Sequence, residues 1–69
     1  MGSFSEYENA IKTVEDLTIG TEEWKEAIND VNTKVLELMQ SYALLGQYVS
    51  MDSNGMLSIS DEGMDALIE

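Results

Sequence analysis

The sequence contains no cysteine, no histidine and no proline, and only three of its 69 residues are basic. Without cysteine the chain forms neither a disulfide nor a thiolate metal site. Without histidine it lacks the most common catalytic base and the most common zinc ligand, so no imidazole can activate its serine hydroxyls. A chain this short also offers little room for two carboxylates in unequal environments, which acid–base catalysis needs. We therefore expect a protein that is not an enzyme and that holds no cofactor.

The scarcity of basic residues leaves the chain strongly acidic. Fourteen aspartates and glutamates oppose Lys12, Lys25 and Lys34, which gives a formal net charge of −11. Nucleic acids and anionic lipid surfaces are bound mainly through lysine and arginine, so we expect this protein to bind neither. No apolar run approaches the roughly 18 residues of a membrane-spanning helix. The ordinary effect of such acidity is solubility, and a sharper interpretation is that it attracts a basic protein partner.

A stripe of seven apolar residues, spaced alternately four and three apart, dominates the middle of the chain. These residues, which we call the seam, are Trp24, Ile28, Val31, Val35, Leu38, Tyr42 and Leu45. Their spacing is the a/d pattern of a coiled coil. Because no proline interrupts the stripe and Thr21 is a good N-cap, the sequence predicts one long helix over residues 21–45, broken at Gly46. The seam must be covered by the C-terminal segment, by a second copy, or by the rest of a longer chain.

Shorter elements are expected on both sides of this helix. Apolar residues at helical spacing predict a first helix over residues 4–17. Farther along, Asn54-Gly55 lies between two short alternating runs. Because both residues tolerate positive φ, this pattern predicts a β-hairpin over residues 48–59. A last short helix is expected over residues 60–69.

The expected fold class is therefore mainly α: a helical hairpin with one long heptad-patterned helix, a short β-hairpin and a short C-terminal helix. Residues 1–69 form a single small helical domain or a fragment of one. A chain of this size buries only about 60% of its unfolded surface, so self-association through the seam would supply missing burial. We therefore expect a homo-oligomer, or association with the rest of a larger chain.

The hairpin loop also resembles the core of an EF-hand calcium site. Aligned with Gly55 at the sixth loop position, it offers Asp52, Asn54 and Asp61 as weak candidate ligands. However, Ser50 stands where the first loop position requires aspartate, and Asp61 stands where the last requires a bidentate glutamate. With about two charged ligands left, we expect weak or no calcium binding and interpret the segment as a hairpin turn.

Two stretches of the chain resemble a helical segment of phage tail tape-measure proteins and related large phage-like structural chains. The first covers residues 21–38 and the second residues 48–63, so that the span from the first to the last of them is about two-thirds of the sequence. Such segments often carry proline after the tyrosine that matches Tyr42, where this chain has Ala43. The resemblance includes no catalytic residue. It implies a mechanical role in a chain that lies extended inside the tail and sets its length, located in the bacterial host cytoplasm and the virion tail.

Two functional hypotheses follow. The first is a non-enzymatic structural segment of a larger phage-type, tape-measure-like protein that self-associates through the seam. The alternative is a free-standing acidic protein-interaction module, or a small inhibitor, that docks on a basic partner surface. The helix that still runs at Glu69 favours the first hypothesis. A seam covered within one chain would favour the second.

Overall fold

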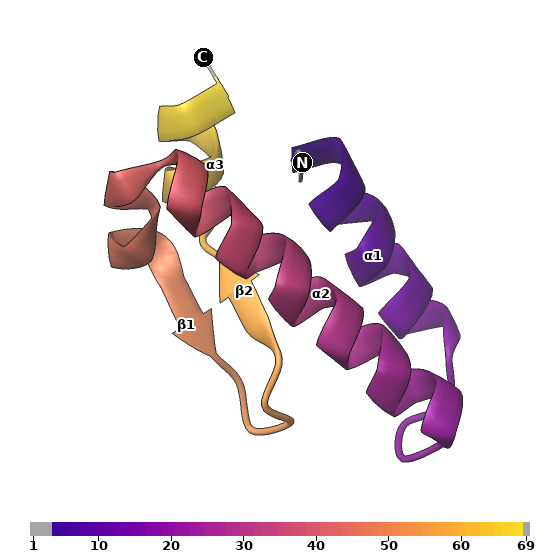
Figure 1. Ribbon diagram of the computed structural model, residues 1–69. Helices are drawn as coiled ribbons and strands as arrows, with labels where there is room; N and C mark the ends of the chain where they lie inside the picture. Colours follow the sequence, from indigo (N-terminus) through magenta and orange to yellow (C-terminus); the bar gives the residue numbers. More distant parts are fainter. Residues whose placement is uncertain (1–3, 69) are drawn as a thin grey trace.

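The computed structural model describes the backbone of residues 4–68 and the side chains of residues 4–65. Its elements are α1 (Phe4–Asp16), α2 (Glu22–Ser41), the 3-10 helix η1 (Ala43–Tyr48), β1 (Val49–Met51), β2 (Leu57–Ile59) and α3 (Asp61–Ile68). This confirms the expected mainly α class, with a helical hairpin, a two-stranded antiparallel sheet and a short C-terminal helix. In Figure 1, α2 lies in the middle, with α1 on one side and the β-hairpin on the other.

The turn between α1 and α2 forms as the sequence predicts. Gly20 adopts a positive φ of 94°, a conformation that glycine reaches without steric cost. Thr21 is the N-cap of α2, and its Oγ1 accepts a hydrogen bond from the N–H of Trp24 at 3.2 Å. The first helix ends at Asp16, one residue before its predicted end at Leu17.

The prediction that the second helix runs to Leu45 and breaks at Gly46 is wrong. The helix ends at Ser41, because Tyr42 adopts an extended conformation with φ −126° and ψ 96°. The chain then turns into η1, which packs back against α2 and leaves Leu45 with 0% of its surface exposed. In this arrangement Leu45 belongs to the same buried cluster as Leu38, and the burial of its apolar side chain stabilises the turn into η1.

The β-hairpin and its turn at residues 52–55 have the expected place, but the backbone conformation of Asn54 differs from the expectation. Its strands pair in the register Val49↔Ile59, Ser50↔Ser58 and Met51↔Leu57. The N–H of Gly55 donates a hydrogen bond to the carbonyl of Asp52 at 3.1 Å. Gly55 has a positive φ of 82°, and no other residue of this fully described loop has a positive φ. This is a type I turn followed by a left-handed glycine. Asn54 therefore does not use the positive φ expected of it.

Two side chains from the helices close the outer edge of β2. Oδ1 of Asn32 accepts a hydrogen bond from the N–H of Leu57 at 2.7 Å, and its Nδ2 donates to the carbonyl of Gly55 at 3.0 Å. The hydroxyl of Tyr7 accepts a hydrogen bond from the N–H of Ile59 at 2.9 Å. These contacts join α1 and α2 to the hairpin and satisfy N–H groups that point away from β1.

The last helix begins one residue later than predicted. Ser60 is outside α3 and caps it, since its Oγ accepts a hydrogen bond from the N–H of Gly63 at 3.2 Å. Gly63 packs so closely against η1 that a Cβ there would lie 2.5 Å from Cβ of Tyr48. The predicted end of this helix, Glu69, lies outside the described residues.

Candidate functional site

The structure places most of the seam in the core of the single chain. Ile28, Val31, Val35, Leu38 and Leu45 are buried, and Val31 and Val35 have no exposed surface at all. Their cover comes from the same chain, because α1, β2 and η1 all pack against α2. The seam is therefore not an open surface in this fold. The sequence left three possibilities for what covers the seam: the C-terminal segment, a second copy, or the rest of a longer chain. In the structure, the C-terminal segment covers it together with the first helix.

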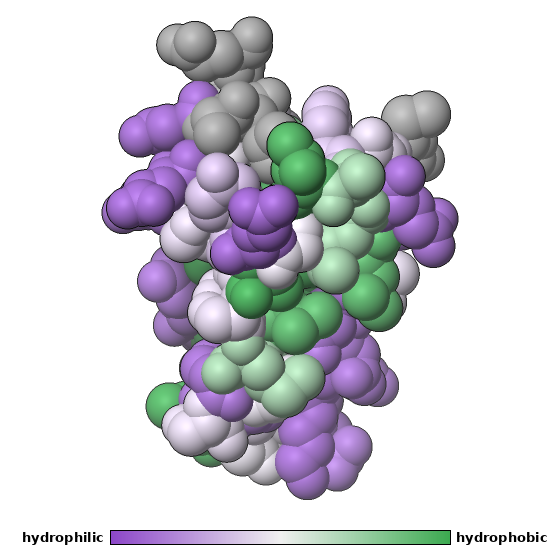
Figure 2. Space-filling model, turned by 90° about the vertical axis from the view of Figure 1, so that its left-hand side faces the viewer, coloured by the Kyte–Doolittle hydropathy of each residue, from purple (hydrophilic) through white to green (hydrophobic). Residues whose placement is uncertain are grey.

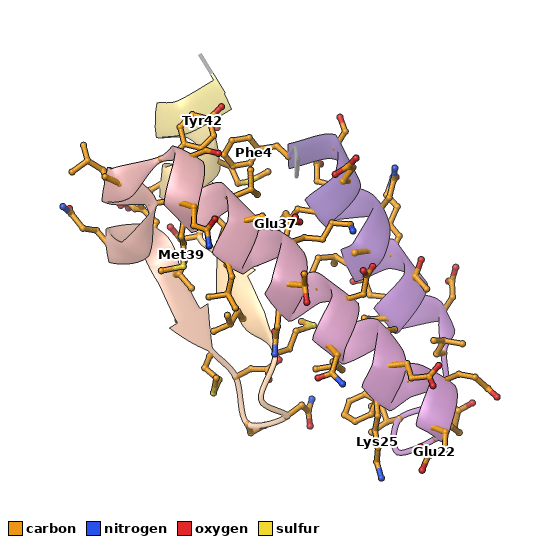
Figure 3. All side chains as sticks on the ribbon, viewed as in Figure 1. Phe4, Glu22, Lys25, Glu37, Met39 and Tyr42 are labelled. Carbon is orange, nitrogen blue, oxygen red and sulfur yellow. The ribbon has the colours of Figure 1, made fainter. Side chains whose placement is uncertain are left out.

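Among the residues of the seam, Trp24 and Tyr42 are the two that reach solvent. Trp24 is half-buried at the start of α2, and Tyr42 is 40% exposed just beyond its end. The ring of Tyr42 meets the ring of Phe4 with centroids 5.6 Å apart and planes tilted by 45° (Figure 3). This tilted pair holds the start of α1 against the end of α2.

The calcium candidates are occupied by local structure or lie apart in the fold. Oδ1 of Asp52 accepts hydrogen bonds from the N–H groups of Asn54 and Met56, at 2.8 and 3.1 Å, so this carboxylate stabilises the hairpin turn. Asp61 lies beyond β2, in the first turn of α3. Within the described part of the chain, no three acidic side chains gather in a group that could hold a metal ion.

A shallow groove of about 270 Å³ lies between α1, the end of β2 and α3. Its floor is apolar and consists of Tyr7, Ile11, Ile59 and Met64. Its rim is charged and consists of Glu8, Lys12, Glu15 and Asp61. The groove exists because α1 and α3 both approach β2 without filling the space between them.

The rim of this groove is acidic. Three carboxylates oppose one ammonium group there, and all four side chains are exposed. Glu8 and Glu15 lie two helical turns apart on α1, which separates their positions by about 10 Å along the helix axis. The excess of negative charge around this concave apolar surface attracts cations to its mouth. Such a site favours a cationic side chain whose aliphatic part covers the apolar floor.

Sequence reasoning did not find this groove. Its residues come from two segments about fifty positions apart, as Glu8 and Asp61 illustrate, and no spacing rule links them. The sequence carries only part of the signal, since Tyr7 and Ile11 lie four apart, as expected on the apolar face of the first helix. Their second role depends on the position of α3, which only the folded chain defines.

A second exposed feature is apolar and lies on the side of the hairpin. Met51 is 64% exposed, Leu44 is 63% exposed, and Leu36 on α2 is also exposed. Figure 2 views the molecule from the side of β1 and η1 and shows hydrophobic side chains gathered through the middle of this face, bordered by hydrophilic ones. The fold thus offers two distinct surfaces, an acidic groove and an apolar strip beside β1.

Comparisons with known proteins found no matching family model, no matching curated protein and no matching solved structure. The resemblance to tape-measure proteins therefore stays a prediction. Within the described residues, no helix is both long and apolar enough to cross a membrane.

Proposed function

We propose that the protein is a non-enzymatic, acidic interaction module that binds a basic, partly apolar segment of another protein in the groove between α1 and α3. The observation that carries this proposal is the groove itself, whose apolar floor lies under a rim of three carboxylates and one ammonium group. The formal net charge of −11 on the whole chain adds long-range attraction for a basic partner.

The size of the groove limits what it can hold. A volume of about 270 Å³ suits one or two side chains rather than a metabolite, since ligand pockets usually measure roughly 300–1,000 Å³. Arginine and lysine fit both parts of the site, because their methylene stems pack on Ile11 and Met64 while their charged ends reach the rim. A leucine beside them would fill the remaining floor.

The competing hypothesis, a self-associating phage-type structural segment, relied on the seam as a surface for other copies. Because this chain covers Val31, Val35 and Leu38 itself, self-association through those side chains would require the fold to open. The acidic module needs no such opening, and this difference decides our preference. The acidic groove and the apolar strip beside β1 could both be used if the protein were part of a larger structural chain.

The test uses a fluorescein-labelled, helix-forming peptide of leucine and lysine as the probe, with fluorescence anisotropy at physiological salt as the readout. The double variant Glu8→Gln/Asp61→Asn removes two rim charges and should weaken binding about tenfold, which corresponds to about 1.4 kcal/mol. A matched peptide with glutamate in place of lysine should not bind.

The control is Glu22→Gln/Glu37→Gln, which changes the net charge equally on exposed positions of α2 (Figure 3). It should alter the affinity less than twofold. If both double variants weaken binding equally, the probe senses only net charge and the groove is not the site. If the wild-type protein does not bind the leucine–lysine peptide, the proposed function itself is wrong.

A further inference from the structure

The wall that α1 contributes to the groove carries its charges in a fixed order. After Tyr7, its side chains along the helix are Glu8, Ile11, Lys12 and Glu15. Their spacing of three and four positions sets them along one side of the helix. Glu8 and Glu15 stand at the two ends, about 10 Å apart along the axis, and the other two lie between them. The wall is therefore negative at both ends, and apolar and positive in the middle.

Lys12 is exposed in the middle of this wall, and the fold does not neutralise its charge. Within the described part of the chain, no ion pair joins Lys12 to a carboxylate. A basic residue of a partner is repelled beside Lys12 and attracted at either end of the wall, where a glutamate stands. A partner that is basic throughout therefore loses part of its attraction, whereas one with an acidic or apolar middle does not.

The separation of the two glutamates favours a helical partner over an extended one. On a helix, residues seven positions apart lie on the same side and about 10 Å apart along the axis. On a strand, residues on the same side are about 7 or about 13 Å apart, and neither distance matches that between Glu8 and Glu15. A helix that lies along α1 can therefore meet both glutamates with two basic residues, at its positions i and i+7.

We infer that the partner segment is an amphipathic helix with basic residues at i and i+7 and none between them on the same face, and that Lys12 determines this specificity. The inference rests on the function proposed above. Positions i+3 and i+4 of the partner lie between its basic residues and face Ile11 and Lys12, whichever direction the helix runs. An apolar residue there reaches the floor of the groove, and an acidic one pairs with Lys12. The volume of about 270 Å³ holds the apolar side chain while the helix lies over the mouth.

Two fluorescein-labelled peptides of identical composition test the order of charges, with fluorescence anisotropy as the readout. Both have flanks of alanine and glutamine, which favour a helix. The first carries lysine at i and i+7, leucine at i+3 and glutamate at i+4. The second exchanges the glutamate with the lysine at i+7, which brings a lysine to Lys12 and a glutamate to one end of the wall. The wild-type protein should bind the first peptide at least about tenfold more tightly.

Lys12→Glu should remove this preference. With a carboxylate in the middle of the wall, each peptide makes two favourable charge contacts and one unfavourable contact, so the two affinities should agree within about twofold. The control Lys25→Glu makes the same change of charge at an exposed position of α2 outside the groove (Figure 3) and should keep the preference. Because the two peptides carry equal charge, the ratio of their affinities does not depend on general attraction. Circular dichroism would show that both variants are folded.

A third peptide tests the helical conformation of the partner. It is the first peptide with proline at i+5, on the side away from the groove, where proline ends the helix between the two lysines. It should bind at least about tenfold more weakly than the first. Equal binding of the first two peptides, a preference that survives Lys12→Glu, or undiminished binding of the proline peptide overturns this inference. If the leucine–lysine peptide still binds in those cases, the proposed function stands. If none of the peptides binds, the proposed function and this inference are both wrong.

Discussion

At the scale of single residues, two polar side chains connect the helices to the sheet. Asn32 and Tyr7 each accept a hydrogen bond from an N–H of β2 that no other described group reaches. A buried N–H that loses its partner keeps the full cost of leaving water. These two contacts therefore set the position of the hairpin against α1 and α2 more strictly than apolar packing alone.

We expect Asn32→Ala to destabilise the fold by roughly 1–3 kcal/mol, because the N–H of Leu57 and the carbonyl of Gly55 both lose a partner. Urea unfolding would measure the change, and hydrogen exchange should show the amide of Leu57 exchanging faster. The control Asn29→Ala changes an exposed residue of the same helix and should alter stability by less than about 0.5 kcal/mol. Equal effects of the two substitutions would contradict the role assigned to Asn32.

At the scale of elements, the sequence predicts most of the secondary structure because the signals are local. The heptad spacing, the cap at Thr21 and the Asn54-Gly55 turn each act within a few residues. The end of α2 could not be predicted in this way. The chain leaves the helix at Tyr42 without proline or glycine at that place, so that Leu45 can turn back and be buried. Burial of this kind depends on elements that form far away in the sequence.

The position of this break predicts the effect of Ala43→Pro. Ala43 is the first residue of η1, where proline is well tolerated, and Tyr42 before it is already extended. We expect a gain in stability of about 0.4–1 kcal/mol, because proline restricts the unfolded chain. Gln40→Pro, inside α2, should instead cost about 3 kcal/mol. Thermal unfolding would compare the two variants, and an equal loss would show that the helix continues past Tyr42.

At the scale of the whole molecule, neither the groove nor the use of the seam follows from the sequence pattern. A heptad stripe states that one face of a helix needs cover, but it does not state whether another chain or the same chain supplies it. Here α1, β2 and η1 surround α2, and the same packing leaves the acidic groove between α1 and α3. The acidity was evident from composition, whereas the gathering of Glu8, Glu15 and Asp61 around apolar side chains depends on tertiary structure.

This role of the seam can be tested with Val31→Asp, which places a carboxylate at a position with no exposed surface. We expect a loss of roughly 3–5 kcal/mol, comparable to the entire stability of so small a domain. The variant should therefore be largely unfolded by circular dichroism at every protein concentration, since the seam belongs to the fold of one chain. Thr33→Asp adds the same charge at an exposed position of α2 and should remain folded. If Val31→Asp instead stayed folded and lost only its ability to associate, the seam would be an interface between chains, and the order of preference between the two functions would reverse.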